Sequence, residues 1–167
     1  MVSAVADEIE DAPDGFEQLR AMLAGDLKAP MAEKLGFTLV ELERGHAVFE
    51  ATPDRSVYNP LGSVHGGYAA TLLDSACGIA VHSQLGANRG HTTLELKISY
   101  LRGLSERSGT VRATGRTISV GRRVAFAEAT LHDGDGRLCA TATSTLLVFD
   151  VEPRPVAEAA LTTATDA

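Results

Sequence analysis

The second half of the chain alternates between apolar and polar residues, which is the two-residue period of a half-buried strand. Residues 93–101 show the alternation most clearly: Leu94, Leu96, Ile98 and Tyr100 share one face, and polar side chains occupy the other. Three more runs follow, separated by short turns such as Asp133-Gly134-Asp135-Gly136. These runs cover residues 109–120, 122–132 and 137–149. The pattern predicts a four-stranded antiparallel meander.

The first half predicts two short helices, a hairpin and one long helix. Apolar positions recur at helical spacing over residues 16–23, and a second helix follows Pro30 and ends near Gly36. Alternating residues on both sides of Gly45 predict a hairpin over residues 37–53. Residues 66–85 keep an apolar stripe surrounded by small residues, so we expect a long helix covered by other structure.

The order of these elements predicts an α+β fold, in which one antiparallel sheet wraps around one long central helix. A sheet with one apolar face must bury that face, and the long helix is the available partner. The fold fits one domain over residues 15–150. Residues 1–14 are acidic and poor in apolar residues, so we expect disorder there. The Ala/Thr-rich residues 151–167 are expected to form a C-terminal tail.

The net charge of −7 is concentrated at the ends of the chain. Residues 1–17 carry six acidic residues and no basic ones, and residues 150–167 also carry an acidic excess, which leaves the body with a small positive charge. The body lacks the dense Lys/Arg stripe expected for nucleic-acid binding. No apolar run is long enough to span a membrane, and the acidic N-terminus does not look like a signal peptide. We therefore expect a cytoplasmic protein that binds neither nucleic acid nor membrane.

Residues 59–74, NPLGSVHGGYAATLLD, hold the candidate chemistry. Gly66 and Gly67, directly before the long helix, allow close backbone approach and leave the first helical amides free. These amides lie at the positive end of the helix dipole and can bind a carbonyl oxygen or an oxyanion. Asp74 follows about two turns later among apolar residues, where a carboxylate is unfavourable unless it is hydrogen-bonded or functional. A tight turn and a structural buried carboxylate are the alternative explanations.

The spacing Asn59-x-x-Gly62-x-x-His65-Gly66-Gly67, followed by Leu73-Asp74, resembles the signature of hotdog-fold acyl-CoA thioesterases of the phenylacetate-pathway (PaaI) type. The resemblance covers roughly residues 15–150. It implies hydrolysis of an acyl-CoA thioester to a free acid and CoA, with no cofactor, since CoA is part of the substrate. It also implies a homodimer paired through its sheet, often a dimer of dimers and hence a homotetramer, with active sites shared between subunits.

The same resemblance implies a role for each matching residue. Asp74 acts as the nucleophile or as the general base for water, and the Gly66 amide polarises the thioester carbonyl. Asn59 and His65 line the same pocket, where Asn59 positions the water or the carboxylate. Thr93 falls where relatives often carry a Ser or Thr that steadies the water. One subunit would supply Asp74 and Thr93, and the other the remaining residues. Gly66 and Asp74 lie about 12 Å apart along one helix, so a two-subunit site is also physically sensible.

Further residues are expected to contact the two ends of the substrate. Arg122 and Arg123, in a turn between predicted strands, are candidates for the CoA phosphates, because arginine forks suit phosphate oxygens. Arg102 is a weaker candidate. An apolar slot for the acyl group is expected from Tyr68, Leu72 and Leu61. The glycine Gly67 completes the expected substrate contacts.

Structural explanations stand beside these roles. Asn59 with Pro60 is a common turn pair, Thr93 could be an ordinary strand residue, and turn arginines are often simply solvated. The histidines and the two cysteines, Cys77 and Cys139, show no ligand spacing, so no metal site is predicted.

The leading function is an enzyme that hydrolyses acyl-CoA. The alternative is a module that binds acyl-CoA without cleaving it, for instance as a regulator. A regulator would be expected to carry a DNA-binding appendage, for which residues 1–36 are too short and too acidic. A dehydratase or hydratase of the same fold would need a different pairing of Asp or Glu with His. The sequence leaves open the acyl group, nucleophile against general base, and dimer against tetramer.

Overall fold

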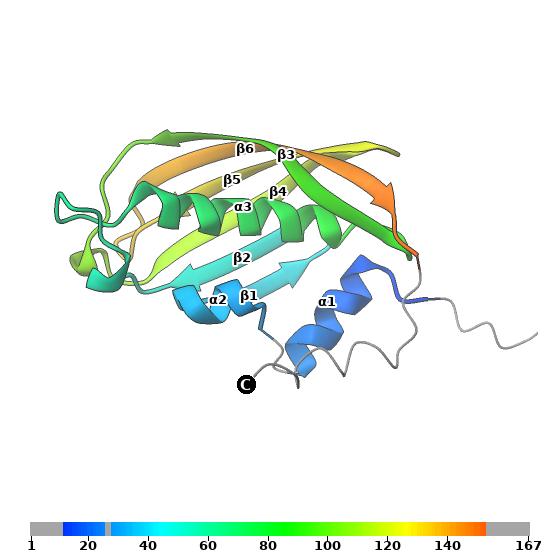
Figure 1. Ribbon diagram of the computed structural model, residues 1–167, viewed down its shortest axis with the longest axis horizontal. Helices are drawn as coiled ribbons and strands as arrows, with labels where there is room; N and C mark the ends of the chain where they lie inside the picture. The colour runs from blue at the N-terminus through cyan, green and yellow to red at the C-terminus, as the bar shows by residue number, and fades with distance from the viewer. Residues whose placement is uncertain (1–11, 26–27, 153–167) are drawn as a thin grey trace, which may run out of the picture.

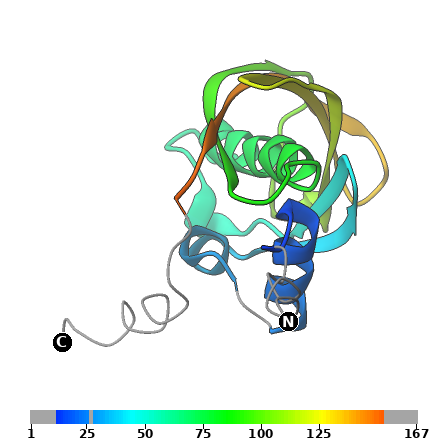
Figure 2. The same ribbon diagram turned by 90° about the vertical axis from the view of Figure 1, so that its right-hand side faces the viewer.

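The computed structural model describes residues 12–25 and 28–152, in which six strands form one antiparallel sheet around a long helix (Figures 1 and 2). The strands are β1 (Phe37–Glu43), β2 (His46–Ala51), β3 (Arg89–Tyr100), β4 (Val111–Val120), β5 (Val124–His132) and β6 (Leu138–Asp150). The helices are α1 (Gly15–Ala24), α2 (Pro30–Leu35) and the long α3 (Gly66–His82), with single 3-10 turns at Arg55–Val57 and Glu106–Ser108. This arrangement confirms the predicted α+β hotdog architecture.

Small residues on the inner face of the sheet allow α3 to approach it closely. Gly115 of β4 is the closest point, because a Cβ atom there would lie 2.2 Å from the carbonyl oxygen of Ala76. Alanines line much of the remaining inner face, and all of the following are buried: Ala47, Ala113, Ala125, Ala127, Ala129, Ala140 and Ala142. The helix contributes Leu72, Leu73 and Val81 to the core, and all three are fully buried. The sheet adds other large buried side chains: Val48, Val111, Leu131 and Leu146.

The predicted meander of four strands is wrong in one respect. The strand order is β1-β2-β4-β5-β6-β3, so β3 pairs with β6 and forms an edge of the sheet, whereas the meander had placed it beside β4. Residues 101–110 join β3 to β4 and include a 3-10 turn, which makes the connection too long for a tight hairpin. Alternation along the chain identifies each strand, but long connections allow several pairings. The strand β3 also begins at Arg89, four residues earlier than expected.

The helix α3 is not covered on all sides. It begins at Gly66 as predicted, but it ends at His82 with Ser83 as its C-cap, before the expected stop at Gly86. The residues on its open face are half-buried in the described chain: Ala70, Thr71, Asp74, Ser75, Ile79 and His82. The first two helices lie below this region and beside the first hairpin (Figure 1).

The expectations for the two ends of the chain fall mostly outside the described residues. Residues 1–11 and 153–167 are not described, so the predicted disorder of residues 1–14 and the predicted tail over residues 151–167 stay predictions. Asp14 is described and caps α1: its side chain accepts a hydrogen bond from the backbone N–H of Glu17, and Glu17 reciprocates.

Candidate active site

Asp74 lies in the middle of α3 on its open face, and Thr93 of β3 lies opposite. The hydroxyl of Thr93 donates a 2.9 Å hydrogen bond to Oδ1 of Asp74. A β-bulge between Thr93 and Glu95 interrupts the regular pairing of β3 with β6 at this point. Within residues 12–25 and 28–152, Asp74 Oδ2 accepts no hydrogen bond, so one carboxylate oxygen is held and the other is free. The structure thus brings together the two residues that were expected from one subunit.

The start of α3 presents one free amide. Nδ1 of His65, the N-cap residue, accepts a 2.8 Å hydrogen bond from the N–H of Gly67. Because an accepting Nδ1 carries no proton, the neutral ring holds its hydrogen on Nε2. The N–H of Gly66 has no hydrogen-bond acceptor in the described part of the chain. The Gly66 carbonyl accepts a 2.9 Å hydrogen bond from the hydroxyl of Tyr100, which fixes this turn against the end of β3.

Asn59 closes its own loop. Its Oδ1 accepts hydrogen bonds from the N–H groups of Leu61 and Ser63, at 2.9 and 3.3 Å, and its Nδ2 donates to the Ser63 hydroxyl at 3.0 Å. Gly62 supports this turn with a positive φ of 82°. In this chain the Asn59 side chain therefore stabilises a turn, which is the structural role that its pairing with Pro60 also predicted.

A cavity of about 210 Å³ lies beside the start of α3. His65, Gly66, Tyr100 and Arg102 contribute polar groups to it, and the buried wall comes from Leu131 and neighbouring core residues. Asp74 does not line this cavity, because it lies about 12 Å further along the helix axis. The two halves of the expected site therefore occupy separate places on one chain.

The expected acyl slot is not assembled. Leu72 is fully buried and Tyr68 is 5% exposed, so both belong to the core, and the Tyr68 hydroxyl donates to the Leu35 carbonyl at 3.2 Å. Leu61 is 93% exposed, in the loop closed by Asn59. The apolar stripe that suggested a slot is the face of α3 that packs against the sheet. Gly67 is exposed, but its N–H is occupied by His65.

The candidate phosphate ligands lie far from Gly66 in one chain. Arg122 and Arg123 are exposed in the turn between β4 and β5, at the end of the molecule away from the start of α3 (Figure 1). The Arg122 backbone carbonyl accepts a hydrogen bond from the Arg89 side chain. Arg102, the weaker candidate, lines the cavity beside Gly66.

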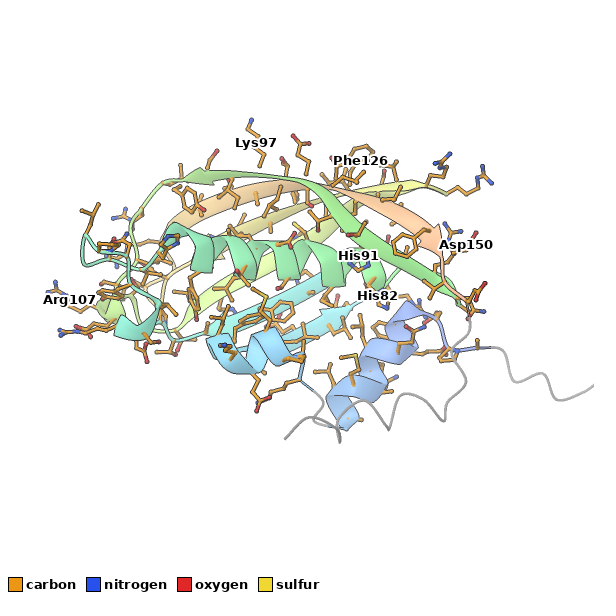
Figure 3. All side chains as sticks on the ribbon, in the orientation of Figure 1. His82, His91, Lys97, Arg107, Phe126 and Asp150 are labelled. Carbon is orange, nitrogen blue, oxygen red and sulfur yellow. The ribbon has the colours of Figure 1, made fainter. Side chains whose placement is uncertain are left out.

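A pair of histidines that no pattern in the sequence indicated lies at the other end of α3. The rings of His82 and His91 lie side by side with their centroids 5.4 Å apart (Figure 3). Burial, with a smaller contribution from His82, lowers the pKa of His91 to about 4. Burial also lowers the pKa of His82, whose Nε2 is hydrogen-bonded to Gln18 of α1 at 3.2 Å. The two histidines are nine positions apart in the sequence, so no local motif indicated this pair.

Other kinds of site find no support in the described residues. No group of three or more His, Cys, Asp and Glu side chains in residues 12–25 and 28–152 could hold a metal ion. Across the same residues, no helix combines the length and hydropathy needed to cross a membrane. Burial raises the pKa of the Cys77 thiol to about 12, which disfavours the nucleophilic thiolate.

Comparison with known proteins identifies the family. Residues 61–140 match the family model of the thioesterase superfamily. The protein SSO1253 of Saccharolobus solfataricus, named as an esterase, is 30% identical to this chain over 115 residues. The aligned region covers 69% of this chain and 75% of SSO1253. The chain belongs to the thioesterase superfamily. The matched region of this superfamily member includes Gly66, Asp74 and Thr93, and begins two residues after Asn59.

Two further proteins are similar to this thioesterase-superfamily chain. The 1,4-dihydroxy-2-naphthoyl-CoA hydrolase of Listeria monocytogenes is 26% identical over 118 residues, which are 71% of this chain and 94% of that enzyme. The solved structure of the E. coli PaaI protein, from the phenylacetic acid degradation operon, superposes with a TM-score of 0.72 at 21% identity. That superposition covers 82% of this chain and 94% of PaaI, and it shows a shared fold. The predicted resemblance to PaaI-type hotdog thioesterases is confirmed.

Proposed function

We propose that this protein hydrolyses acyl-CoA thioesters, with Asp74 as the acidic catalytic residue and the Gly66 amide as the donor to the thioester carbonyl. The observation that carries the proposal is the Asp74 carboxylate, held at one oxygen by Thr93 and free at the other. The family membership supports thioester hydrolysis in general, and the Listeria relative is named for hydrolysis of an aryl-CoA.

The reaction follows from these groups. As a general base, the free oxygen of Asp74 takes a proton from water while the water oxygen bonds to the thioester carbon. The negative charge that develops on the carbonyl oxygen is stabilised by the Gly66 N–H and the helix dipole. Collapse of the intermediate breaks the C–S bond, and the thiolate takes up the proton that Asp74 removed from water, which yields a free acid and CoA. As a nucleophile, Asp74 would instead attack the thioester carbon, break the C–S bond and expel the CoA thiolate, which takes up a proton from solvent. The resulting mixed anhydride is then cleaved by water.

The site requires two copies of the chain. Asp74 and Gly66 of one chain are too far apart to act on one carbonyl, since the helix axis separates them by about 12 Å. The edge strand β3 is 12 residues long and carries exposed apolar side chains, including Leu94 at 60% and Tyr100 at 55%. An open edge of this kind favours pairing with another strand. We propose a homodimer through β3, assembled further into a homotetramer, in which Asp74 and Thr93 of one subunit face Gly66 and His65 of the other.

The nucleotide end of CoA is assigned to arginine. Arg122 and Arg123 remain the proposed phosphate ligands, and in a dimer they would act at a site shared with the partner. Arg102 competes with them, because it lines the cavity beside Gly66. Alanine variants should separate these assignments. Replacement of a true phosphate ligand raises KM for acyl-CoA but leaves KM for the matching acyl-pantetheine, which lacks the phosphates, unchanged. We propose no cofactor beyond the CoA of the substrate, and a cytoplasmic location.

A thiol-release assay tests the function. The native protein is assayed on acetyl-, hexanoyl-, phenylacetyl- and lauroyl-CoA, beside Asp74→Asn and the control Asp135→Asn, whose carboxylate is exposed in the β5–β6 turn. Asp74→Asn should lower kcat by about 10²–10⁴-fold, the usual contribution of a general base, while the control keeps its activity. Normal turnover by Asp74→Asn would contradict the mechanism. Tight acyl-CoA binding without any turnover by the native protein would favour the non-catalytic binding module.

Single turnover in ¹⁸O-labelled water separates the two roles of Asp74. Label in the Asp74 carboxylate identifies the nucleophile. Because water can also open the mixed anhydride at the acyl carbon, which labels only the released acid, the acyl-enzyme is in addition trapped with hydroxylamine; absence of both label and trapped adduct identifies the general base.

A further inference from the structure

Gly78 is the one glycine in the interior of α3, and the structure shows what its missing side chain accommodates. Glycine is disfavoured inside a helix relative to alanine, because its backbone loses more conformational freedom. Gly78 is buried, and a Cβ atom there would lie 3.1 Å from Nε2 of His91 on β3. Non-bonded atoms of this kind prefer a separation of about 3.5 Å or more. The glycine therefore leaves room for the His91 ring that an alanine would take.

This contact lies next to the hydrogen bond between Thr93 and Asp74. Gly78 follows Asp74 by four residues, so the two lie one above the other on α3, about 6 Å apart along the axis. His91 precedes Thr93 by two residues, so their side chains share one face of β3, about 6.7 Å apart. Both are half-buried, whereas Thr92 between them is exposed. Helix and strand thus meet at two adjacent points, the hydrogen bond to the carboxylate and the contact of the ring with the glycine.

The His91 ring is braced on a second side. The ring of His82 lies beside it, with the two centroids 5.4 Å apart (Figure 3). His82 is in turn hydrogen-bonded to Gln18 of α1 at 3.2 Å. A methyl group at Gly78 would require the ring to move by a few tenths of an ångström. Because His82 limits the movement of the ring, the displacement is passed to β3.

The strand β3 yields more easily than the core strands. Within one chain it is held on one side only, by β6, and the β-bulge directly after Thr93 interrupts that pairing. The hydrogen bond from Thr93 to Asp74 is 2.9 Å long, and bonds between a hydroxyl and an oxygen rarely exceed about 3.0 Å. A shift of a few tenths of an ångström is therefore enough to weaken it. The distance between α3 and β3 at this point decides whether the hydroxyl reaches the carboxylate.

We propose that Gly78 and His91 are positioning residues of the enzyme: their contact sets the distance between α3 and β3 at which Thr93 orients the Asp74 carboxylate. The assignment rests on the proposed thioesterase function and adds two residues to it, neither of which touches the reacting atoms. Because the orientation of the carboxylate matters in the chemical step, kcat responds to this contact and KM does not.

Two double-mutant cycles test the assignment. Gly78→Ala adds the methyl group, and it is combined with Thr93→Val, which removes the hydroxyl, and separately with His91→Ala, which removes the ring. Gly86→Ala is the matched control, because a Cβ atom at Gly86 would meet no atom within 4 Å. We measure kcat and KM on the acyl-CoA that the native protein hydrolyses fastest, and thermal unfolding of each variant. A crystal structure of Gly78→Ala gives the distance between Thr93 Oγ1 and Asp74 Oδ1.

The effect of the methyl group should require both the ring and the hydroxyl. Gly78→Ala alone should lower kcat by about three- to tenfold, the upper value being that of a lost hydrogen bond to a charged group. Its KM should stay within about twofold of the native value, and the distance between the two oxygens should exceed about 3.2 Å. In the Thr93→Val and His91→Ala backgrounds, Gly78→Ala should change kcat by less than about twofold. Gly86→Ala should keep the native kcat.

Several outcomes would overturn the positioning role alone. These are native kcat in Gly78→Ala, an unchanged distance between the two oxygens, or an equal loss of kcat in all three backgrounds. If Gly78→Ala does not fold, its combination with His91→Ala must fold and turn over like His91→Ala, and failure to do so would overturn the steric account. Absence of turnover by the native protein on every acyl-CoA would overturn the proposed function and the positioning role together.

Discussion

The Thr93 hydroxyl on the edge strand β3 donates a 2.9 Å hydrogen bond to the Asp74 carboxylate in the middle of α3. Helix and strand are thus joined at the residue on which the proposed chemistry depends. The bond fixes the orientation of the carboxylate and leaves its second oxygen available. Because β3 is also the proposed dimer edge, subunit pairing and the orientation of Asp74 involve the same strand.

Removal of this hydrogen bond should slow turnover without removing Asp74. Thr93→Val keeps the shape of the side chain but loses the donor, so we expect kcat to fall by about tenfold, equivalent to the roughly 1.4 kcal/mol of a hydrogen bond to a charged group. Thr93→Ser restores the hydroxyl and should recover most of the rate. Steady-state kinetics on the best acyl-CoA provides the measurement. Equal activity of the Val and Ser variants would show that Thr93 is an ordinary strand residue.

Loss of the His65 cap should destabilise α3. His65→Ala leaves the Gly67 N–H without its acceptor, so the free energy of unfolding should fall by about 1 kcal/mol. His65→Asn supplies another N-cap acceptor and should stay within a few tenths of a kcal/mol of the native value. Urea denaturation followed by circular dichroism measures both. An Asn variant as unstable as the Ala variant would mean that the ring contributes by packing and that capping is secondary.

Acid should destabilise the protein through His91. Burial, with a smaller contribution from His82, lowers the pKa of His91 from 6.5 to about 4. Between these values the unfolded chain binds a proton that the folded chain does not, so the free energy of unfolding falls as the pH is lowered from 6.5 to 4. The loss should be on the order of 1–3 kcal/mol, since the ring is partly open to solvent.

The variant His91→Phe tests this assignment. The phenylalanine keeps a ring over Gly78 of α3 and removes the titrating group. The native ring packs closely there, because a Cβ atom added to Gly78 would lie 3.1 Å from Nε2 of His91. Denaturation at pH 7, 6, 5 and 4 should show a flatter dependence for the variant than for the native protein. The remaining slope should come in part from His82, whose pKa burial also lowers. An unchanged slope would assign the acid sensitivity to other groups.

Local patterns in the sequence determined the elements and the start of the site. The strands follow a two-residue period, α3 begins at the paired glycines, and Asp74 stands out as a carboxylate on an apolar helix. Each of these features depends on residues within a few positions of one another. The spacing of Asn59, His65, Gly66 and Asp74 by itself also indicated the family.

Only the tertiary structure decided which distant segments meet. It placed β3 at the edge beside β6, joined Thr93 to Asp74, and brought His82 next to His91. It also placed Tyr68 and Leu72 of the expected acyl slot in the core and left Leu61 exposed, and it formed an apolar cavity behind α1. The physical reason is that periodicity tells which face of an element is apolar, but it does not tell what covers that face. Long connections allow several arrangements, and the choice among them depends on how well side chains from the whole chain pack together.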